Sequence, residues 1–151
     1  MTTLSQAVEV LISRLPHGEG LPLPARATPG SAGYDLASAE AAAIQPGERR
    51  LFQTGFRIAV PAGFECQLRP RSGLALRHGI TLPNTPATID SDYRGELMVA
   101  LINLASEAFE ITRGMRIAQM VLARVEEVGF SEVGELPDSS RGQGGFGSTG
   151  R

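Results

Sequence analysis

Residues 49–69 read RRLFQTGFRIAVPAGFECQLR, two apolar-rich stretches on either side of Val60-Pro61-Ala62-Gly63. Proline presets the backbone for a turn and glycine accepts left-handed backbone, so this tetrapeptide is a strong turn signal. Few stretches of the chain carry a clean helical apolar period over ten positions or more. The segment therefore predicts two strands, Arg49 to Ala59 and Phe64 to Arg69, joined by a turn.

The same pattern continues outward in both directions, because 18 glycines and 10 prolines divide the chain into short pieces. Four more strands are predicted: Ala7 to Leu15, Glu96 to Asn103, Phe109 to Ile111 and Ile117 to Val125. One short helix is predicted from Ser72 to Arg77, with Ser72 capping its first turn and Gly79 just past its end. Many short strands with Pro and Gly turns favour an all-β sandwich or jelly roll.

Composition limits the classes of partner. A chain of 151 residues with 42 % hydrophobic content predicts one domain. A net charge of −2 gives no general basic field, so we expect no nucleic-acid partner. All fourteen cationic residues are Arg and none is Lys, which excludes a Schiff-base lysine and a Walker-type lysine. Anion recognition must then use guanidinium groups or backbone N–H groups.

The single cysteine and the N-terminal region bear on location. Cys66 has no partner for an internal disulfide, and with two histidines a zinc cluster is not expected. The first apolar stretch, Val8 to Leu15, is interrupted by Glu9, Ser13 and Arg14. We therefore expect no membrane association and a cytoplasmic protein whose Cys66 is a small core residue.

The segment 141–151, RGQGGFGSTGR, combines five glycines with one aromatic ring, two hydroxyl groups and two guanidinium groups. Glycine loses more backbone freedom on ordering than any other residue, so this segment forms helix or strand poorly. An anion bound by Arg141, Ser148, Thr149 and the backbone N–H groups, with a planar ring stacked on Phe146, would order it. A nucleotide has both parts.

The most polar internal segment is 88–97, TIDSDYRGEL. Asp90, Ser91 and Asp92 are typical of an Asx turn between strands. Alternatively, Asp90 and Tyr93 lie together at the mouth of a hairpin, where the carboxylate takes a proton from water and the ring supports a sugar.

Three further segments carry polar chemistry. Arg69 to Ala75 places two arginines and a hydroxyl at a helix start, which is either a small anion site or an ordinary cap. Asp35, in SAGYDL, is equally compatible with holding a metal-bound water and with starting a turn. Gln119 is one amide in an apolar strand, where an amide usually serves structure.

Taken in order, five motifs resemble those of the trimeric deoxyuridine triphosphatases, also called dUTP pyrophosphatases. They are AGYDL at 32–36, PRSGLA at 70–75, the stretch from Asn84 through IDSDYRGEL to Met98, RIAQM at 116–120 and RGQGGFGSTG at 141–150. The resemblance covers nearly the whole chain. It implies an all-β, β-clip or jelly-roll-like single domain over 1–136 with one short helix, and a flexible Gly-rich arm over 137–151 that closes over the active site.

The resemblance also implies roles for the polar residues. Asp90 matches the general base that deprotonates the water attacking the α-phosphorus, and Tyr93 matches the ring beneath the deoxyribose. The uracil-reading hairpin corresponds to Asn84, Thr88, Ile89 and Met98. A departure lies at Leu82-Pro83-Asn84-Thr85-Pro86, where two prolines stand in place of the glycine of many members and stiffen the hairpin.

The phosphate-binding residues follow in the same way. Arg71, Ser72 and Gly73 match the phosphate-holding turn, Gln119 a further phosphate contact, and Asp35 a residue that supports Mg²⁺ through water while the substrate phosphates hold most of the ion. In the arm, Phe146 would stack on uracil, and the β- and γ-phosphates would be closed over by Arg141, Gly147, Ser148 and Thr149.

The implied function is Mg²⁺-dependent hydrolysis of dUTP to dUMP and pyrophosphate, which keeps uracil out of DNA and supplies dUMP for thymidylate synthesis. The implied assembly is a homotrimer with active sites shared between subunits. Two alternatives remain: a non-catalytic trimeric nucleotide-binding or signalling module, and dCTP deaminase of the same fold. Deaminases carry a catalytic glutamate in the strand after the aspartate loop, where this chain has Ala100.

Overall fold

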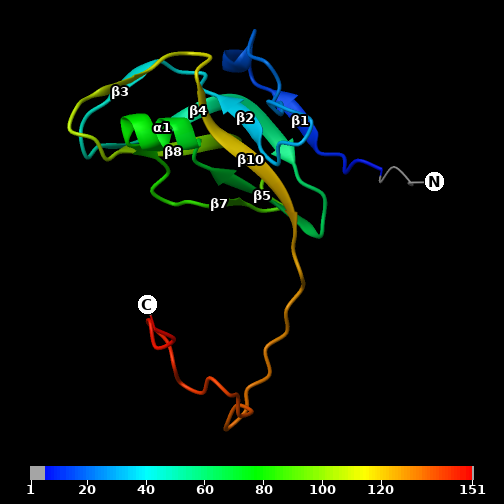
Figure 1. Ribbon diagram of the computed structural model, residues 1–151. Helices are drawn as coiled ribbons and strands as arrows, with labels where there is room; N and C mark the ends of the chain where they lie inside the picture. Colours follow the sequence, from blue (N-terminus) through cyan, green and yellow to red (C-terminus); the bar gives the residue numbers. More distant parts are fainter. Residues whose placement is uncertain (1–5, 151) are drawn as a thin grey trace.

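The fold is described from a computed structural model, which covers residues 6–150. Two four-stranded antiparallel sheets face each other, and a two-stranded sheet lies at one end (Figure 1). In spatial order the first sheet contains β1 (Leu11–Arg14), β4 (Arg49–Ala59), β8 (Glu96–Asn103) and β6 (Ile80–Thr81). The second contains β2 (Tyr34–Ala37), β10 (Arg116–Arg124), β5 (Phe64–Arg69) and β7 (Ala87–Ile89), and the small sheet pairs β3 (Ala42–Ile44) with β9 (Phe109–Ile111). The prediction of an all-β fold is confirmed.

The core lies between the two large sheets because their strands alternate apolar and polar residues. In β8, Leu97, Val99 and Leu101 are fully buried while the residues between them are partly exposed. Phe52 of β4 and Leu68 of β5 are equally buried in the same cluster. Burying each such side chain contributes about 1.5 to 3 kcal/mol, so this period-two pattern holds the sheets together.

Four of the strands predicted from sequence agree with the structure in both bounds: β4, β5, β8 and β9. The first strand is shorter than predicted, since β1 covers Leu11–Arg14, and β10 is displaced by one residue at each end. Four short strands, β2, β3, β6 and β7, were missed. At two to four residues each, they are too short to show an apolar period.

The helix α1 runs from Ser72–His78, and Gly79 ends it in the left-handed conformation at φ 65°, as predicted. The predicted cap at Ser72 is wrong. Arg71 is the N-cap, because its backbone is extended and its carbonyl accepts the first helical hydrogen bond from the N–H of Ala75 at 3.1 Å. The Ser72 hydroxyl is therefore left exposed at the helix start.

Two connections predicted as hairpins are links between sheets. β6 pairs with β8 in the first sheet, whereas β7 pairs with β5 in the second, so Leu82 to Pro86 crosses from one sheet to the other. Residues 90–95 cross back from β7 to β8 in the same way. Both polar segments therefore lie where the chain changes sheets, and tertiary packing sets their shape.

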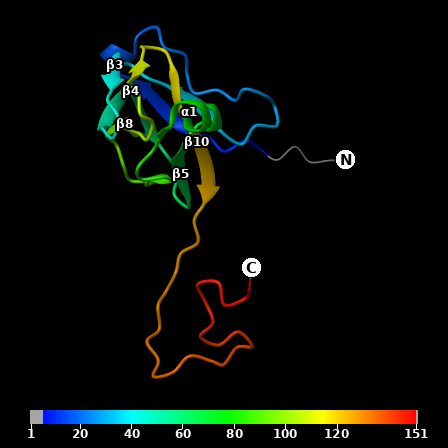
Figure 2. The ribbon, with the colours of Figure 1, turned by 60° about the vertical axis from the view of Figure 1, so that its left-hand side comes forward.

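After β10 the chain leaves the β domain, and Figures 1 and 2 show it running away from the sheets. Residues 125–150 contain no helix or strand. Phe146 is fully exposed, and so are the apolar side chains of Phe130 and Leu136. A 3-10 turn, η1 (Pro16–Gly18), follows β1, and within residues 6–150 no helix is long and apolar enough to cross a membrane.

Candidate active site

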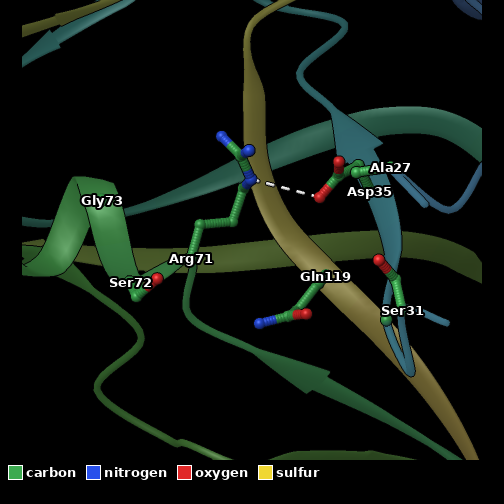
Figure 3. A pocket seen from close by; sticks show the side chains of 8 residues that line it. Ala27, Ser31, Asp35, Arg71, Ser72, Gly73 and Gln119 are labelled. Atoms are coloured by element: carbon green, nitrogen blue, oxygen red, sulfur yellow. Dashed lines mark hydrogen bonds and ion pairs between the residues drawn. The ribbon is translucent and has the colours of Figure 1, made fainter.

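The first half of the candidate site is a hollow between β2, β10 and the start of α1 (Figure 3). Its chemistry comes from the segments that the sequence singles out, since Asp35 lies on β2, Gln119 on β10, and Arg71 immediately before the helix. The hollow is lined by Ala27, Ser31, Gly33, Asp35, Arg71, Ser72, Gly73 and Gln119. We call it the guanidinium hollow.

Asp35 lies within β2, where it is engaged by two arginines, and the described residues 6–150 place no cluster of three metal-ligating side chains around it. Arg71 Nε donates to Asp35 Oδ1 at 3.1 Å, and Arg116 Nη1 donates to Asp35 Oδ2 at 3.4 Å. The pair fixes the direction of the Arg71 guanidinium, which Figure 3 shows reaching across β10 toward β2. The charges of Arg71 and Asp35 balance within the lining, and Arg116, which pairs with Asp35 from outside the lining, gives the hollow and its rim one excess positive charge.

Gln119 has a structural hydrogen bond and also faces the hollow. Its Nε2 donates to the carbonyl oxygen of Pro70 at 2.9 Å, which ties β10 to the segment before the helix. Gly33 is packed against this side chain, and a Cβ added at Gly33 would lie 2.9 Å from Gln119 Cδ. This hydrogen bond agrees with the structural interpretation of the amide, while its Oε1 is turned toward Gly33 and the hollow, as a phosphate contact would require.

The second half of the site is separate and acidic. Asp90 lies in a hollow with Ser91 and Asp92, and its lining also contains Gly63, Phe64, Glu65, Val125, Glu126 and Glu127. We call it the acidic hollow. Its lining carries five carboxylates and no cationic side chain, so by itself it would repel a triphosphate.

Tyr93 is held beside Asp90 by a local turn. The N–H of Tyr93 donates to the carbonyl of Asp90 at 3.2 Å, and Tyr93 Oη donates to the carbonyl of Glu96 at 2.8 Å. The ring is 40 % exposed, so one face is available for contact. The predicted proximity of Asp90 and Tyr93 is therefore present, although the segment connects two sheets.

The remaining predicted site residues lie in three places. Asn84, Thr85 and Pro86 are exposed, and the Thr85–Pro86 peptide bond is cis. Thr88 and Ile89 belong to β7, and Met98 belongs to β8 opposite Gln53. The residues of the arm, Arg141, Phe146, Gly147, Ser148 and Thr149, are exposed and line neither hollow.

The sequence analysis missed two residues of the site. Arg116 was quoted within a motif but given no role, and its ion pair with Asp35 depends on the antiparallel pairing of β2 with β10. Gly33 was likewise passed over, although its lack of a side chain makes room for Gln119. Both contacts, Arg116 with Asp35 and Gly33 with Gln119, join residues that are far apart in sequence and become neighbours only when β2 lies beside β10. A local sequence pattern could not indicate them.

Comparison with known proteins identifies the family to which these motifs belong. The dUTPase family model matches residues 19–150. A deoxyuridine 5'-triphosphate nucleotidohydrolase of Zymomonas mobilis is 57 % identical over 143 residues, covering 95 % of this chain and 98 % of that protein. The protein of the same name from Rhizobium meliloti is 59 % identical over 141 residues, covering 91 % of this chain and 88 % of its own length.

Solved structures agree in fold. A Staphylococcus bacteriophage 80alpha dUTPase mutant, solved with dUpNHpp, superposes with a TM-score of 0.86 at 24 % identity, covering 95 % of this chain and 99 % of the phage chain. A mutant dUTPase from phage phi11 of S. aureus, reported with a structural Mg(II) ion, superposes with a TM-score of 0.78 at 21 % identity. The match covers 86 % of this chain and 99 % of the phage chain.

Proposed function

Because the chain belongs to the dUTPase family, its reaction is the hydrolysis of dUTP, and we propose that water attacks the α-phosphorus to release dUMP and pyrophosphate. The reaction keeps uracil out of DNA and supplies dUMP for thymidylate synthesis. The observation that carries the mechanism is the separation of the two hollows, one cationic and one acidic. We place the enzyme in the cytoplasm, where nucleoside triphosphates are made.

The guanidinium hollow holds the phosphates. Arg71 is oriented by Asp35 through Nε and by the carbonyl of Arg116, to which Nη1 donates at 3.5 Å. Its side chain remains partly exposed, so the Nη2 group can meet phosphate oxygens. Ser72 has an exposed hydroxyl, and Gly73 has no side chain to block the approach of the substrate to the first turn of α1. Gln119 supplies a further polar contact at the same place.

Asp90 is the general base. Its carboxylate is exposed in the acidic hollow, where a water molecule can reach it. A carboxylate in hydrogen-bond reach of a water molecule can orient it and accept its proton as the water attacks. The exposed face of Tyr93 lies beneath the deoxyribose and leaves no room for a 2′-hydroxyl.

Uracil is read by the segments that change sheets. Asn84 lies on the exposed link between β6 and β7, and the adjoining backbone belongs to Thr88, Ile89 and Met98. A narrow site there excludes the 5-methyl group of thymine by contact and the 4-amino group of cytosine by its hydrogen-bond pattern. Pro83 and Pro86 limit the backbone freedom of this link.

The two hollows are combined by assembly. The phosphate-binding and base-bearing residues line different hollows of one chain, so a complete site needs both from neighbouring copies. A cationic hollow of one subunit placed against the acidic hollow of the next would balance the charges. The assembly is a homotrimer with three shared sites.

Magnesium fits this site as a water-mediated ion. Within residues 6–150 no three or more His, Cys, Asp or Glu side chains are placed so that they could hold a metal ion together, and both oxygens of Asp35 accept hydrogen bonds from arginines. Mg²⁺ retains several waters and is usually bound through one or two carboxylates and the substrate phosphates. Asp35 would therefore hold it through water, and the bound ion would neutralise charge on the triphosphate.

The arm over 137–151 closes the site. Ordering ten of its residues costs roughly 10 kcal/mol at 1 to 2 kcal/mol each, whereas a charged hydrogen bond returns about 1.5 to 3 kcal/mol. Ordering the arm therefore requires several contacts at once. Phe146 stacks on uracil, and the phosphates are bound by Arg141, Gly147, Ser148 and Thr149. Closure then depends on the triphosphate, because dUMP lacks the β- and γ-phosphates.

The test measures pyrophosphate release from dUTP, UTP, dCTP and dTTP, with and without Mg²⁺, and ammonia release from dCTP. We expect pyrophosphate release from dUTP but not from UTP, dCTP or dTTP, and no ammonia release from dCTP. Ammonia from dCTP would identify a deaminase. Binding of dUTP without pyrophosphate release would identify a non-catalytic nucleotide-binding module.

A further inference from the structure

Tyr93 is anchored to the main chain of Glu96. Its Oη donates to the main-chain carbonyl of Glu96 at 2.8 Å, at the first residue of β8. Gly95 packs directly against the ring, and a Cβ added there would lie 2.6 Å from Tyr93 Cζ. The ring is therefore confined on one side by Gly95 and tied at its tip to Glu96.

The pairing of β8 with its neighbour β4 is interrupted just after Glu96. Glu96 lies opposite Arg57 and Met98 opposite Gln53, and the register shifts between these two pairs, where Gly55 lies at φ 79°. The buried hydroxyl of Thr54 spans part of the gap by donating to the carbonyl of Leu97 at 2.7 Å. Side-chain contacts thus replace part of the main-chain pairing at this end of β8.

The Glu96 side chain supplies one of these contacts, and it reaches the N-terminal segment. His17 Nε2 lies 2.5 Å from Glu96 Oε1, and the carboxylate side chain is only 13 % exposed. Glu96 Oε2 is buried without a hydrogen-bond partner, so among residues 6–150 His17 is the side chain that contacts this carboxylate. Such a carboxylate is held mainly by its contact with His17.

His17 is in turn fixed to the scaffold. It lies in η1, and Arg113 Nη2 donates to the carbonyls of His17 at 3.2 Å and Glu19 at 2.6 Å. Gly18 is buried against the backbone of Gly55, in the interval where the β4–β8 register shifts. A chain of contacts therefore runs from the scaffold through His17 and Glu96 to Tyr93.

We propose that His17 is a specificity-determining positioning residue, which holds Glu96 so that its carbonyl keeps the Tyr93 ring where it excludes ribose. This inference rests on the role proposed above for Tyr93. A small displacement of a positioning contact is enough to change the rate strongly. Loss of the contact lets the ring move and admits the 2′-hydroxyl of UTP.

The experiment compares kcat/KM for dUTP and UTP in His17→Ala and Glu96→Ala. We expect the dUTP/UTP ratio to fall by about tenfold in each, the size of a small steric discrimination. The double variant should fall no further than either single variant, because both remove one contact. His17→Gln keeps a donor toward Glu96 and should restore most of the ratio.

His78→Ala is the matched control, since His78 is the other histidine and stacks on Phe109 with ring centroids 4.7 Å apart, away from Glu96. Glu96→Ala is expected to fold, because it removes a buried oxygen that has no hydrogen-bond partner. It therefore tests the contact even if His17→Ala fails to fold. Tyr93→Leu separates the two proposals. Full selectivity in Tyr93→Leu overturns the role of Tyr93 and with it the inference. Lost selectivity there, with an unchanged ratio in the folded His17 and Glu96 variants, overturns the inference alone.

Discussion

At the scale of single residues, charge and burial separate the groups that can react from those that cannot. Asp90 is exposed in the acidic hollow, whereas Asp35 is held by Arg71 and Arg116. Both oxygens of Asp35 already accept hydrogen bonds from arginines, whereas Asp90 is open to a water molecule. Asp90 is therefore the better candidate for accepting a proton from water.

Asp90→Asn should lower kcat for dUTP by at least about 10², with dUTP affinity kept within about tenfold, because the amide cannot accept the proton. Steady-state kinetics and equilibrium binding of a non-hydrolysable analogue would measure the two quantities. Asp92→Asn is the control, since it removes the same charge from the same hollow. Near-normal turnover in Asp90→Asn would show that Asp90 is not the general base.

Cys66 shows the opposite situation, an ionisable group kept neutral by the core. Burial, with a smaller contribution from the charge of Glu65, raises its pKa from 9.0 to about 12. The folded state therefore keeps the thiol proton between pH 9 and 12 while the unfolded state loses it, so stability falls as pH rises through this range. At pH 10.5 the loss is about 2 kcal/mol.

Urea unfolding at pH 8 and pH 10.5 would measure this loss. The chain has no lysine, so few other groups titrate in the interval. Cys66→Ala should be less stable at pH 8 but should lack most of the alkaline decrease. An equal decrease in Cys66→Ala would assign the effect to another group.

At the scale of elements, two glycines of similar conformation differ in their surroundings. Gly55 in β4 has φ 79° and Gly47 has φ 77°. A Cβ at Gly55 would lie 2.8 Å from the N atom of Gly18, whereas nothing lies within 4 Å of one at Gly47. The close approach of Gly55 to Gly18 holds η1 against β4.

Gly47→Ala should cost about 1 to 2 kcal/mol, the strain of a left-handed alanine. Gly55→Ala should cost about 3 kcal/mol or more, because it adds displacement of the η1 backbone to the same strain. Chemical denaturation of both variants would give the two values. Equal losses would show that the contact between Gly55 and Gly18 contributes little.

At the scale of the whole molecule, we propose that the arm and the β domain have separate tasks. Deleting residues 141–151 should change Tm by less than about 2 °C, because residues 141–150 bury little apolar surface. Activity should fall steeply, and Arg141→Ala should reproduce much of the loss. A large drop in Tm on deletion would make the arm a structural strap.

Shared sites predict complementation between defective chains. An Asp90→Asn chain and a chain lacking 141–151 should each form a nearly inactive trimer, while their mixture should recover activity at sites that combine intact parts. Native mass spectrometry would verify that mixed trimers form. Mixed trimers without activity would show that one chain builds each site.

Local sequence patterns correctly predicted the all-β character, the bounds of β4, β5, β8 and β9, and the end of α1 at Gly79. These features are local, since turn residues and a period-two apolar pattern act over a few positions. The motifs likewise marked Asp90, Tyr93 and Arg71 as polar residues of the site, because such chemistry is visible in the sequence itself.

The tertiary structure alone decided which of these residues meet. The pairing of β2 with β10 brings Asp35 to Arg116, and the division of β6 and β7 between two sheets turns the predicted hairpins into links. The contact of His17 with Glu96 joins residues 79 positions apart. Such contacts depend on sheet order and register, which are set by the packing of the whole core, and no local stretch of sequence contains them.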